Sequence, residues 1–155
     1  MLIVNKDALA NEYNENQVKL AFILKVLDFI DNMPIDSNNL KLCLYGFNAT
    51  EVDFIIEDLD YSKHTNLTLI NEPALKNAKN CSIIFFQKNF EDYKIVLDYT
   101  KDYPILTFAE IKYFTDNSGL VEFYKYKGKY KFVINNDLAI KKEIFFNAKL
   151  LEISK

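Results

Sequence analysis

The chain has 155 residues, of which 50% are hydrophobic, and a formal net charge of −3 at pH 7. A chain of this length buries about 70% of its unfolded surface on folding, so we expect one domain with a single core. The hydrophobic content excludes global disorder. The acidic balance and the complete lack of arginine argue against a general binder of nucleic acids or anionic membranes.

The first 14 residues are interpreted as a lead-in segment, and residues 15–155 as a single domain. A helix is predicted from Asn14 to Asn32, because Pro34 prevents its continuation. Apolar side chains cover most of the circumference of this helix and leave one narrow polar stripe, formed by Lys25, Asp28 and Asn32.

Packing against one face of a sheet does not bury all the apolar surface of such a helix. Either the helix is sandwiched within the domain, or part of its surface contacts a partner or a second copy of the chain. The candidate interface residues are Phe22, Val26, Phe29 and Ile30.

Strand and helix signals alternate through the middle of the chain. Runs of aliphatic and aromatic residues predict strands at Leu40–Tyr45, Leu67–Ile70, Ser82–Phe86 and Ile105–Phe108. The segments between them predict helices near Thr50–Leu59, Pro73–Ala78 and Asn89–Thr100. This βαβα rhythm is typical of a mostly parallel sheet with helices on both faces.

A β-hairpin is predicted near the C-terminus, with strands at Val121–Tyr126 and Lys129–Ile134 and a tight turn at Lys127-Gly128. Aromatic residues alternate with lysines along each strand, so we expect the tyrosines to face the core or a neighbouring helix and the lysines to face water. That arrangement argues against binding of single-stranded nucleic acid. Short helices are expected at Asp137–Lys142 and Ala148–Ser154.

The predicted fold class is therefore α/β. It has a mixed, mostly parallel sheet of five or six strands flanked by helices, with the antiparallel hairpin at one edge.

Sequence patterns typical of catalysis, metal binding or cofactor binding are absent. The single histidine, His64, lies in a polar segment with no Cys or His at metal-ligand spacing, and we expect it to be a solvated loop residue. Gly46, Gly119 and Gly128 are too scattered to form a phosphate-binding loop. We therefore expect no catalytic residues, no metal and no cofactor. A small ligand would bind at the carboxyl ends of the parallel strands, near Gly46, Phe47, Gln87 and Thr107.

The C-terminal residues have the pattern Gly-x-x-x-Phe, then Gly-x-x-x-Phe-x-Ile-Asn, then an alanine and a Leu-Leu pair, between Gly119 and Ser154. This pattern resembles the C-terminal signature of the YfiR family. The similarity extends in the right order to Val18–Pro34, Leu42–Gly46, Asn80–Phe86 and Pro104–Thr107, and so covers roughly residues 15–154. Met33-Pro34 replaces the usual Trp-Pro pair, and the single Gly119 stands where relatives tend to have two glycines.

The resemblance implies a non-enzymatic periplasmic protein that binds the periplasmic part of an inner-membrane diguanylate cyclase and holds it inactive. The same helical surface could equally mediate formation of a homodimer. The alternative is a ligand-binding sensor domain of a larger membrane histidine kinase or cyclase. A third hypothesis is a cytosolic enzyme of unrecognised type.

The two cysteines, Cys43 and Cys81, lie in or beside predicted strands that are neighbours if the first strand lies between the second and third. Neighbouring strands are ~4.8 Å apart, which is within reach of a disulfide, but two reduced, buried thiols fit the same positions. The family resemblance favours the disulfide, because relatives often have cysteines at both positions, and it raises the hypothesis of a redox-responsive protein.

No targeting segment and no membrane-spanning run is evident in the sequence. Taken literally, this predicts an unexported chain without direct membrane insertion. The family resemblance instead implies a periplasmic location, with a signal peptide or membrane segment removed from this chain and Met1 not the native start.

Overall fold

The computed structural model describes residues 6–32, 38–62 and 66–154. The strands are β1 (Ile30–Asn32), β2 (Leu40–Tyr45), β3 (Leu67–Asn71), β4 (Ile83–Phe86), β5 (Leu106–Ala109), β6 (Val121–Tyr126), β7 (Lys129–Ile134) and β8 (Phe145–Phe146). The helices are α1 (Lys6–Leu27), α2 (Ala49–Ser62), α3 (Tyr93–Thr100), α4 (Asn136–Lys141) and α5 (Ala148–Ile153), with 3₁₀ turns η1 (Leu75–Asn80) and η2 (Thr115–Asn117).

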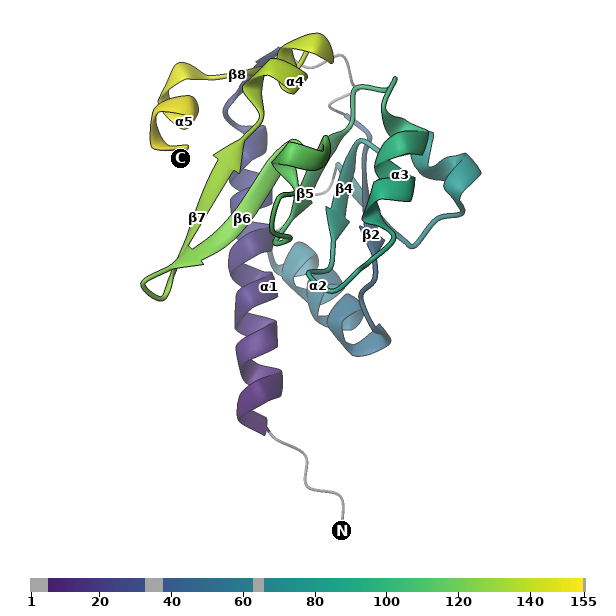
Figure 1. Ribbon diagram of the computed structural model, residues 1–155. Helices are drawn as coiled ribbons and strands as arrows, with labels where there is room; N and C mark the ends of the chain where they lie inside the picture. The colour runs from purple at the N-terminus through teal and green to yellow at the C-terminus, as the bar shows by residue number, and fades with distance from the viewer. Residues whose placement is uncertain (1–5, 33–37, 63–65, 155) are drawn as a thin grey trace.

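The main sheet has six strands in the order β3-β2-β4-β5-β6-β7, and β1 and β8 form a separate two-stranded sheet (Figure 1). Strands β3, β2, β4, β5 and β6 run parallel, whereas β7 pairs antiparallel with β6 at one edge. The predicted α/β class, the mostly parallel mixed sheet and the hairpin at its edge are confirmed.

The central strands are buried on both faces. All residues of β4 and β5 are buried, and so are all of β2 except Lys41, which is half-buried. Strands of this composition need helices on both sides of the sheet. One face packs against α1 and α2 through residues such as Ile23 and Ile55, and the other packs against η1 and α3 through Ala78 and Val96 (Figure 1).

Helix α1 differs from the predicted helix at both ends. It begins at Lys6, inside the expected lead-in segment, and it ends at Leu27 rather than Asn32. Ile30–Asn32 instead forms β1, where Ile30 pairs with Phe146 of β8. The prediction failed here because the backbone of this segment is paired with a strand more than a hundred residues away, which local periodicity does not reveal.

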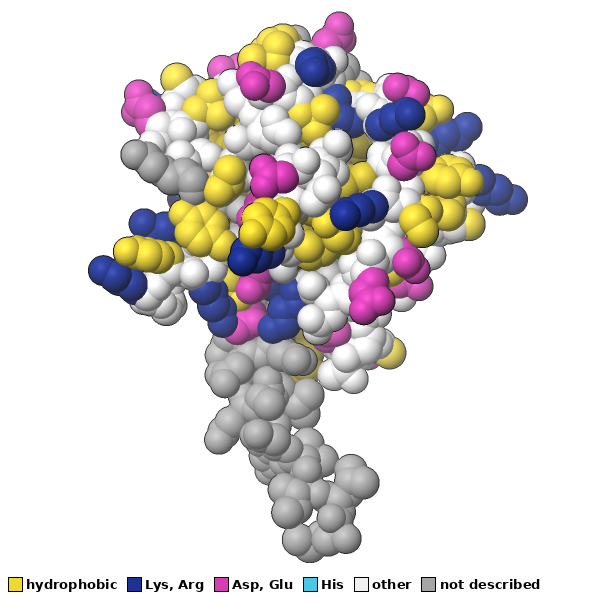
Figure 2. Space-filling view, in the orientation of Figure 1, with side chains coloured by type: hydrophobic (Ala, Val, Ile, Leu, Met, Phe, Trp, Pro, Cys, Tyr) yellow, Lys and Arg dark blue, Asp and Glu magenta, His cyan; other side chains and the backbone are white. Residues whose placement is uncertain are grey.

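The expectation that the hairpin tyrosines face the core is wrong for β6. The register places Tyr124 opposite Lys131 and Tyr126 opposite Lys129, so tyrosines and lysines share one face. Tyr126 is 51% exposed. Figure 2 shows hydrophobic and lysine side chains side by side on the left of the molecule, where the hairpin projects. The alternation within each strand is as expected, but the pairing between strands decides which residues meet.

We predict that Gly119→Ala destabilises the domain more than Gly128→Ala. A Cβ at Gly119 would lie 2.3 Å from ring atoms of the fully buried Phe114, so the ring must move, at a cost of roughly 3 kcal/mol. A Cβ at Gly128 meets no atom within 4 Å, and only its positive φ of 76° disfavours alanine, by about 1 kcal/mol. Urea unfolding of both variants measures the difference, and equal losses would contradict this packing.

Candidate functional site

Cys43 in β2 and Cys81, just before β4, are joined by a disulfide with a Cα–Cα distance of 6.0 Å. The bond lies under η1 and α3, in the core cluster that also contains Ala78 and Val96. The exposed fractions are 0% for Cys43 and 5% for Cys81. A dissolved thiol therefore has almost no access to the sulfur atoms in the folded domain.

The predicted interface residues do not form one exposed surface. Val26 is 1% exposed and belongs to the main core, so it cannot contact a partner while the domain stays folded. Phe22 is half-buried and packs against Phe123 and Phe132, with ring centroids 5.3 and 4.3 Å away. Phe29 and Ile30 are half-buried beside the core.

The outer side of α1 carries other exposed residues instead. Val18 is 50% exposed, and Ala21 and Lys25 are exposed on successive turns of the same helix. The helix is therefore buried along one side and exposed along the other. The sequence left open whether the helix is buried within the domain or contacts a partner, and this arrangement allows both.

The predicted ligand-binding residues have structural roles. Phe47 is 7% exposed and packs against Phe85, and Thr107 is 3% exposed with its hydroxyl oxygen accepting a hydrogen bond from the Leu120 N–H at 2.9 Å. Gly46, in a left-handed conformation, donates its N–H to Glu72. The Gln87 side chain accepts a hydrogen bond from the Asn89 N–H. In this structure Phe47 and Thr107 are not accessible to a ligand.

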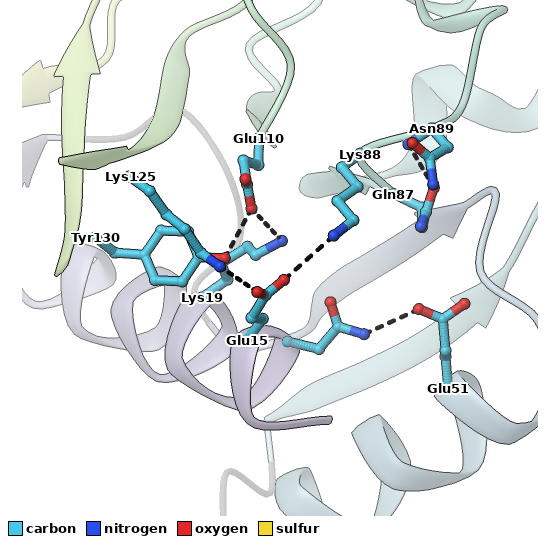
Figure 3. Close-up of polar contacts among 10 residues, drawn as sticks. Glu15, Lys19, Glu51, Gln87, Lys88, Asn89, Glu110, Lys125 and Tyr130 are labelled. Carbon is cyan, nitrogen blue, oxygen red and sulfur yellow. Dashed lines mark hydrogen bonds and ion pairs between the residues drawn. The ribbon is translucent and has the colours of Figure 1, made fainter. Parts of the chain in front are cut away.

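A polar network lies near the carboxyl ends of β4, β5 and β6, and it connects these strands to α1 (Figure 3). Glu15 of α1 accepts hydrogen bonds from Lys88, which follows β4, at 3.3 Å, and from Lys125 of β6. Asn16, on the next position of the helix, donates to Glu51 of α2 at 3.0 Å. These contacts hold α1 across the carboxyl ends of the parallel strands.

The most buried charge in the network is Lys19, which is 3% exposed. Its ammonium group lies 2.9 Å from Glu110, just after β5, and 5.6 Å from the centre of the Tyr130 ring. The Tyr130 hydroxyl donates a second hydrogen bond to Glu110 at 2.8 Å (Figure 3). A buried lysine needs such partners, because an uncompensated charge in the protein interior costs several kcal/mol.

The electrostatics of the network follow from these contacts. Burial by itself raises the pKa of Glu15, but hydrogen bonds from Lys125 and Lys88 outweigh it, so the pKa of Glu15 lies below its ordinary value. Burial and the hydrogen bond to Glu110 raise the pKa of Tyr130. These ion pairs lie at the edge of the sheet where doubly wound domains often bind ligands.

The sequence contained weak signals for this network. Lys19 interrupts an otherwise apolar helical run, and Glu110 directly follows a buried parallel strand. Neither signal identifies its partner, because Lys19 and Glu110 are brought together only by the packing of α1 on the sheet.

In the described part of the chain, no group of three or more His, Cys, Asp or Glu side chains is placed to hold a metal ion. Within the same residues, no helix has the length and apolar character needed to cross a membrane. His64 lies outside the described residues, so its predicted loop position stays a prediction.

Comparison of the sequence with known proteins identifies a family. The sequence model of a family described as YfiR/HmsC-like matches residues 16–155. No curated protein matches the chain.

We predict that the disulfide resists reduction in the folded domain. Alkylation without reductant leaves the intact mass unchanged, and reductant under native conditions leaves Cys43 and Cys81 unmodified for hours because both are buried. Reductant with urea exposes both thiols to alkylation. In the chain-entropy model the bond stabilises the domain by roughly 4 kcal/mol, which unfolding of a Cys43→Ala/Cys81→Ala variant measures. Rapid native reduction would contradict the buried placement.

We predict that Glu15→Gln destabilises the domain at neutral pH but not at low pH. A carboxylate with a lowered pKa in the folded state stabilises that state above its unfolded pKa of about 4.3. The stabilisation, about 1 kcal/mol at neutral pH, fades as the pH falls through the folded-state pKa. Urea unfolding at pH 7 and at about pH 3 measures it. The control is Glu91→Gln, an exposed residue outside the network. A loss that persists at low pH would contradict the ion-pair role.

Proposed function

The chain belongs to the YfiR/HmsC-like family, and from this premise we propose that it binds the periplasmic part of an inner-membrane diguanylate cyclase and holds the cyclase inactive. The family has a periplasmic, regulatory and non-catalytic role in cyclic di-GMP signalling. The observation that carries the proposal is the family match, which extends over residues 16–155 and thus over the whole sheet and its helices, apart from residues 6–15 of α1.

Repression of this kind requires selective binding rather than chemistry. A ligand shifts the equilibrium between two conformations of its partner by at most the ratio of its affinities for them. A regulator that lowers the active population at least about tenfold must therefore bind the inactive conformation at least about tenfold more tightly. The domain therefore needs a rigid surface that fits one conformation. The buried sheet, the disulfide and the ion pairs of Glu15 and Lys19 support such rigidity.

We propose the outer side of α1 around Val18 and Phe22 as part of the partner surface. This surface retains Phe22, which the sequence predicts as an interface residue. It includes the exposed Val18 in place of the buried Val26. A homodimer through the same surface is the second use of this side of the helix.

The burial of Cys43 and Cys81 favours a stabilising disulfide over a redox-responsive one. The alternative function, a ligand-binding sensor domain, gains no support from the carboxyl ends of the strands. Phe47 and Thr107 are buried there, and α1 is held across that edge.

The experiment is a reconstituted cyclase assay. We predict that the chain, added to the periplasmic side of proteoliposomes holding a diguanylate cyclase from the same genome, lowers cyclic di-GMP synthesis at least about tenfold at saturation. Unchanged synthesis at all concentrations would overturn the proposed function.

A matched pair of variants tests the α1 surface in the same assay. Val18→Glu should raise the concentration needed for half repression by about tenfold, because it places a charge on a contact surface. Ile153→Glu, at a 67% exposed position of α5, should leave it unchanged. Thermal unfolding of both variants checks that the fold is retained.

A further inference from the structure

The register of the β6–β7 hairpin divides its side chains between two faces. Phe123 and Phe132 pair with each other, are 3% and 8% exposed, and pack against Phe22 of α1. Residues at alternate positions point the other way. That opposite side, which we call the hairpin outer face, carries Glu122, Tyr124, Tyr126, Lys129, Lys131 and Val133.

Most of this face is not covered by the helices on this side of the sheet. The turn η2 reaches only the start of β6, where the Thr115 N–H and hydroxyl donate hydrogen bonds to Glu122. The core cluster under η1 and α3 takes its strand residues from β2, β4 and β5, and none from β6 or β7. Tyr126 is 51% exposed, Lys129 and Lys131 are exposed, and Tyr124 is half-buried. In Figure 2 this region presents hydrophobic and lysine side chains together at the surface.

Two of the exposed hairpin lysines contact an aromatic ring. The ammonium groups of Lys127 and Lys131 lie 5.3 and 5.1 Å from the centre of the Tyr126 ring. Such cation–π contacts orient the ammonium groups without neutralising them. The hairpin outer face and its turn therefore present ammonium groups beside aromatic ring surface, which suits carboxylates flanked by apolar side chains.

The charge distribution of the whole chain separates the hairpin from the rest. Residues 121–134 contain four lysines and one glutamate, a net charge of +3, whereas the whole chain has −3, so the other residues sum to −6. A basic pole on an acidic molecule attracts an acidic partner and orients it before contact.

A small hollow at the edge of the same hairpin adds an apolar contact. It lies on the α1-facing side of the hairpin and has a volume of about 90 Å³, and its lining includes Val18, Phe22, Phe132 and Lys131. Lys131 thus belongs both to the hairpin outer face and to the hollow. The hollow suits one aliphatic side chain, and such filled pockets carry much of the energy of protein interfaces.

We propose that the hairpin outer face and this hollow together dock an acidic segment of a protein partner, with one aliphatic side chain seated beside Val18 and Phe22 and carboxylates paired with Lys129 and Lys131. The proposal rests on the proposed function, because it names the surface through which the regulator meets its partner.

Two other polyanions fit the surface less well. Sequence-specific nucleic-acid contacts rely largely on arginine, which this chain lacks, and the Tyr126 ring is engaged by lysines rather than free to stack on bases. Anionic membranes are recognised by clusters of four to eight basic residues. Only Lys127, Lys129 and Lys131 are available here, since Lys125 is paired with Glu15.

The first experiment tests the surface independently of any cyclase. The full chain, labelled with ¹⁵N, is titrated with a short synthetic peptide of glutamates around one central leucine, and with the same peptide carrying lysines instead. We expect the acidic peptide to shift the amide signals of residues 121–134 and of the turn around Val18, and the basic peptide to leave them unchanged. No shifts there, or stronger shifts with a single-stranded oligonucleotide or with phosphatidylglycerol vesicles, would overturn the proposal.

The second experiment uses the purified periplasmic region of the cyclase and two charge-reversal variants. Lys129→Glu/Lys131→Glu should weaken its binding by about tenfold or more and reduce the salt dependence of the affinity. Lys76→Glu/Lys79→Glu, which makes the same charge change at exposed positions of η1, should alter the affinity less than about twofold. Calorimetry gives both affinities.

The outcomes separate the two proposals. Equal weakening by both double variants, or by neither, would overturn the docking surface while leaving the regulator intact. Absence of binding by the unmodified chain would overturn the proposed function, and the peptide titration would then decide the docking surface alone. Self-association of Lys129→Glu/Lys131→Glu would show instead that these lysines protect the edge strand β7 from pairing, and would also overturn the proposal.

Discussion

The central strands of this domain have no polar face, and the rest of the structure depends on that constraint. Because β2, β4 and β5 are apolar on both sides, helices must cover both faces of the sheet. Helices α1 and α2 cover one face, and η1 and α3 cover the other and enclose the disulfide. On the second side the coverage ends before the hairpin, which leaves β6 and β7 with a buried face and an open one.

Helix α1 has a second role, because its ion pairs connect it to the residues that follow β4 and β5. In many doubly wound domains this edge holds a ligand, whereas here Glu15 and Lys19 occupy it with internal ion pairs. A partner is therefore expected to bind an outer surface of the domain rather than this edge of the sheet. Such a use of the fold suits a protein whose family acts by binding a signalling partner rather than by catalysis.

Much of the architecture was predictable from local sequence. The strand and helix alternation, the hairpin and the family resemblance follow from short segments whose periodicity and order are visible in the chain. The pairing of β1 with β8 was not predictable, since it joins Ile30 to Phe146 across most of the sequence. The ion pair between Lys19 and Glu110 was missed for the same reason, because the two residues meet only after α1 packs on the sheet.

The sequence by itself determined the fold class, the hairpin at one edge of the sheet and the family, because these depend on hydrophobic periodicity and on residue patterns. Only the tertiary structure decided which side chains are accessible. It buried Val26 and Thr107, which local pattern had marked as functional, and it exposed Val18 and Tyr126. The physical reason is that accessibility depends on strand register and on which helix covers which face, and both are set by contacts between segments far apart in the chain.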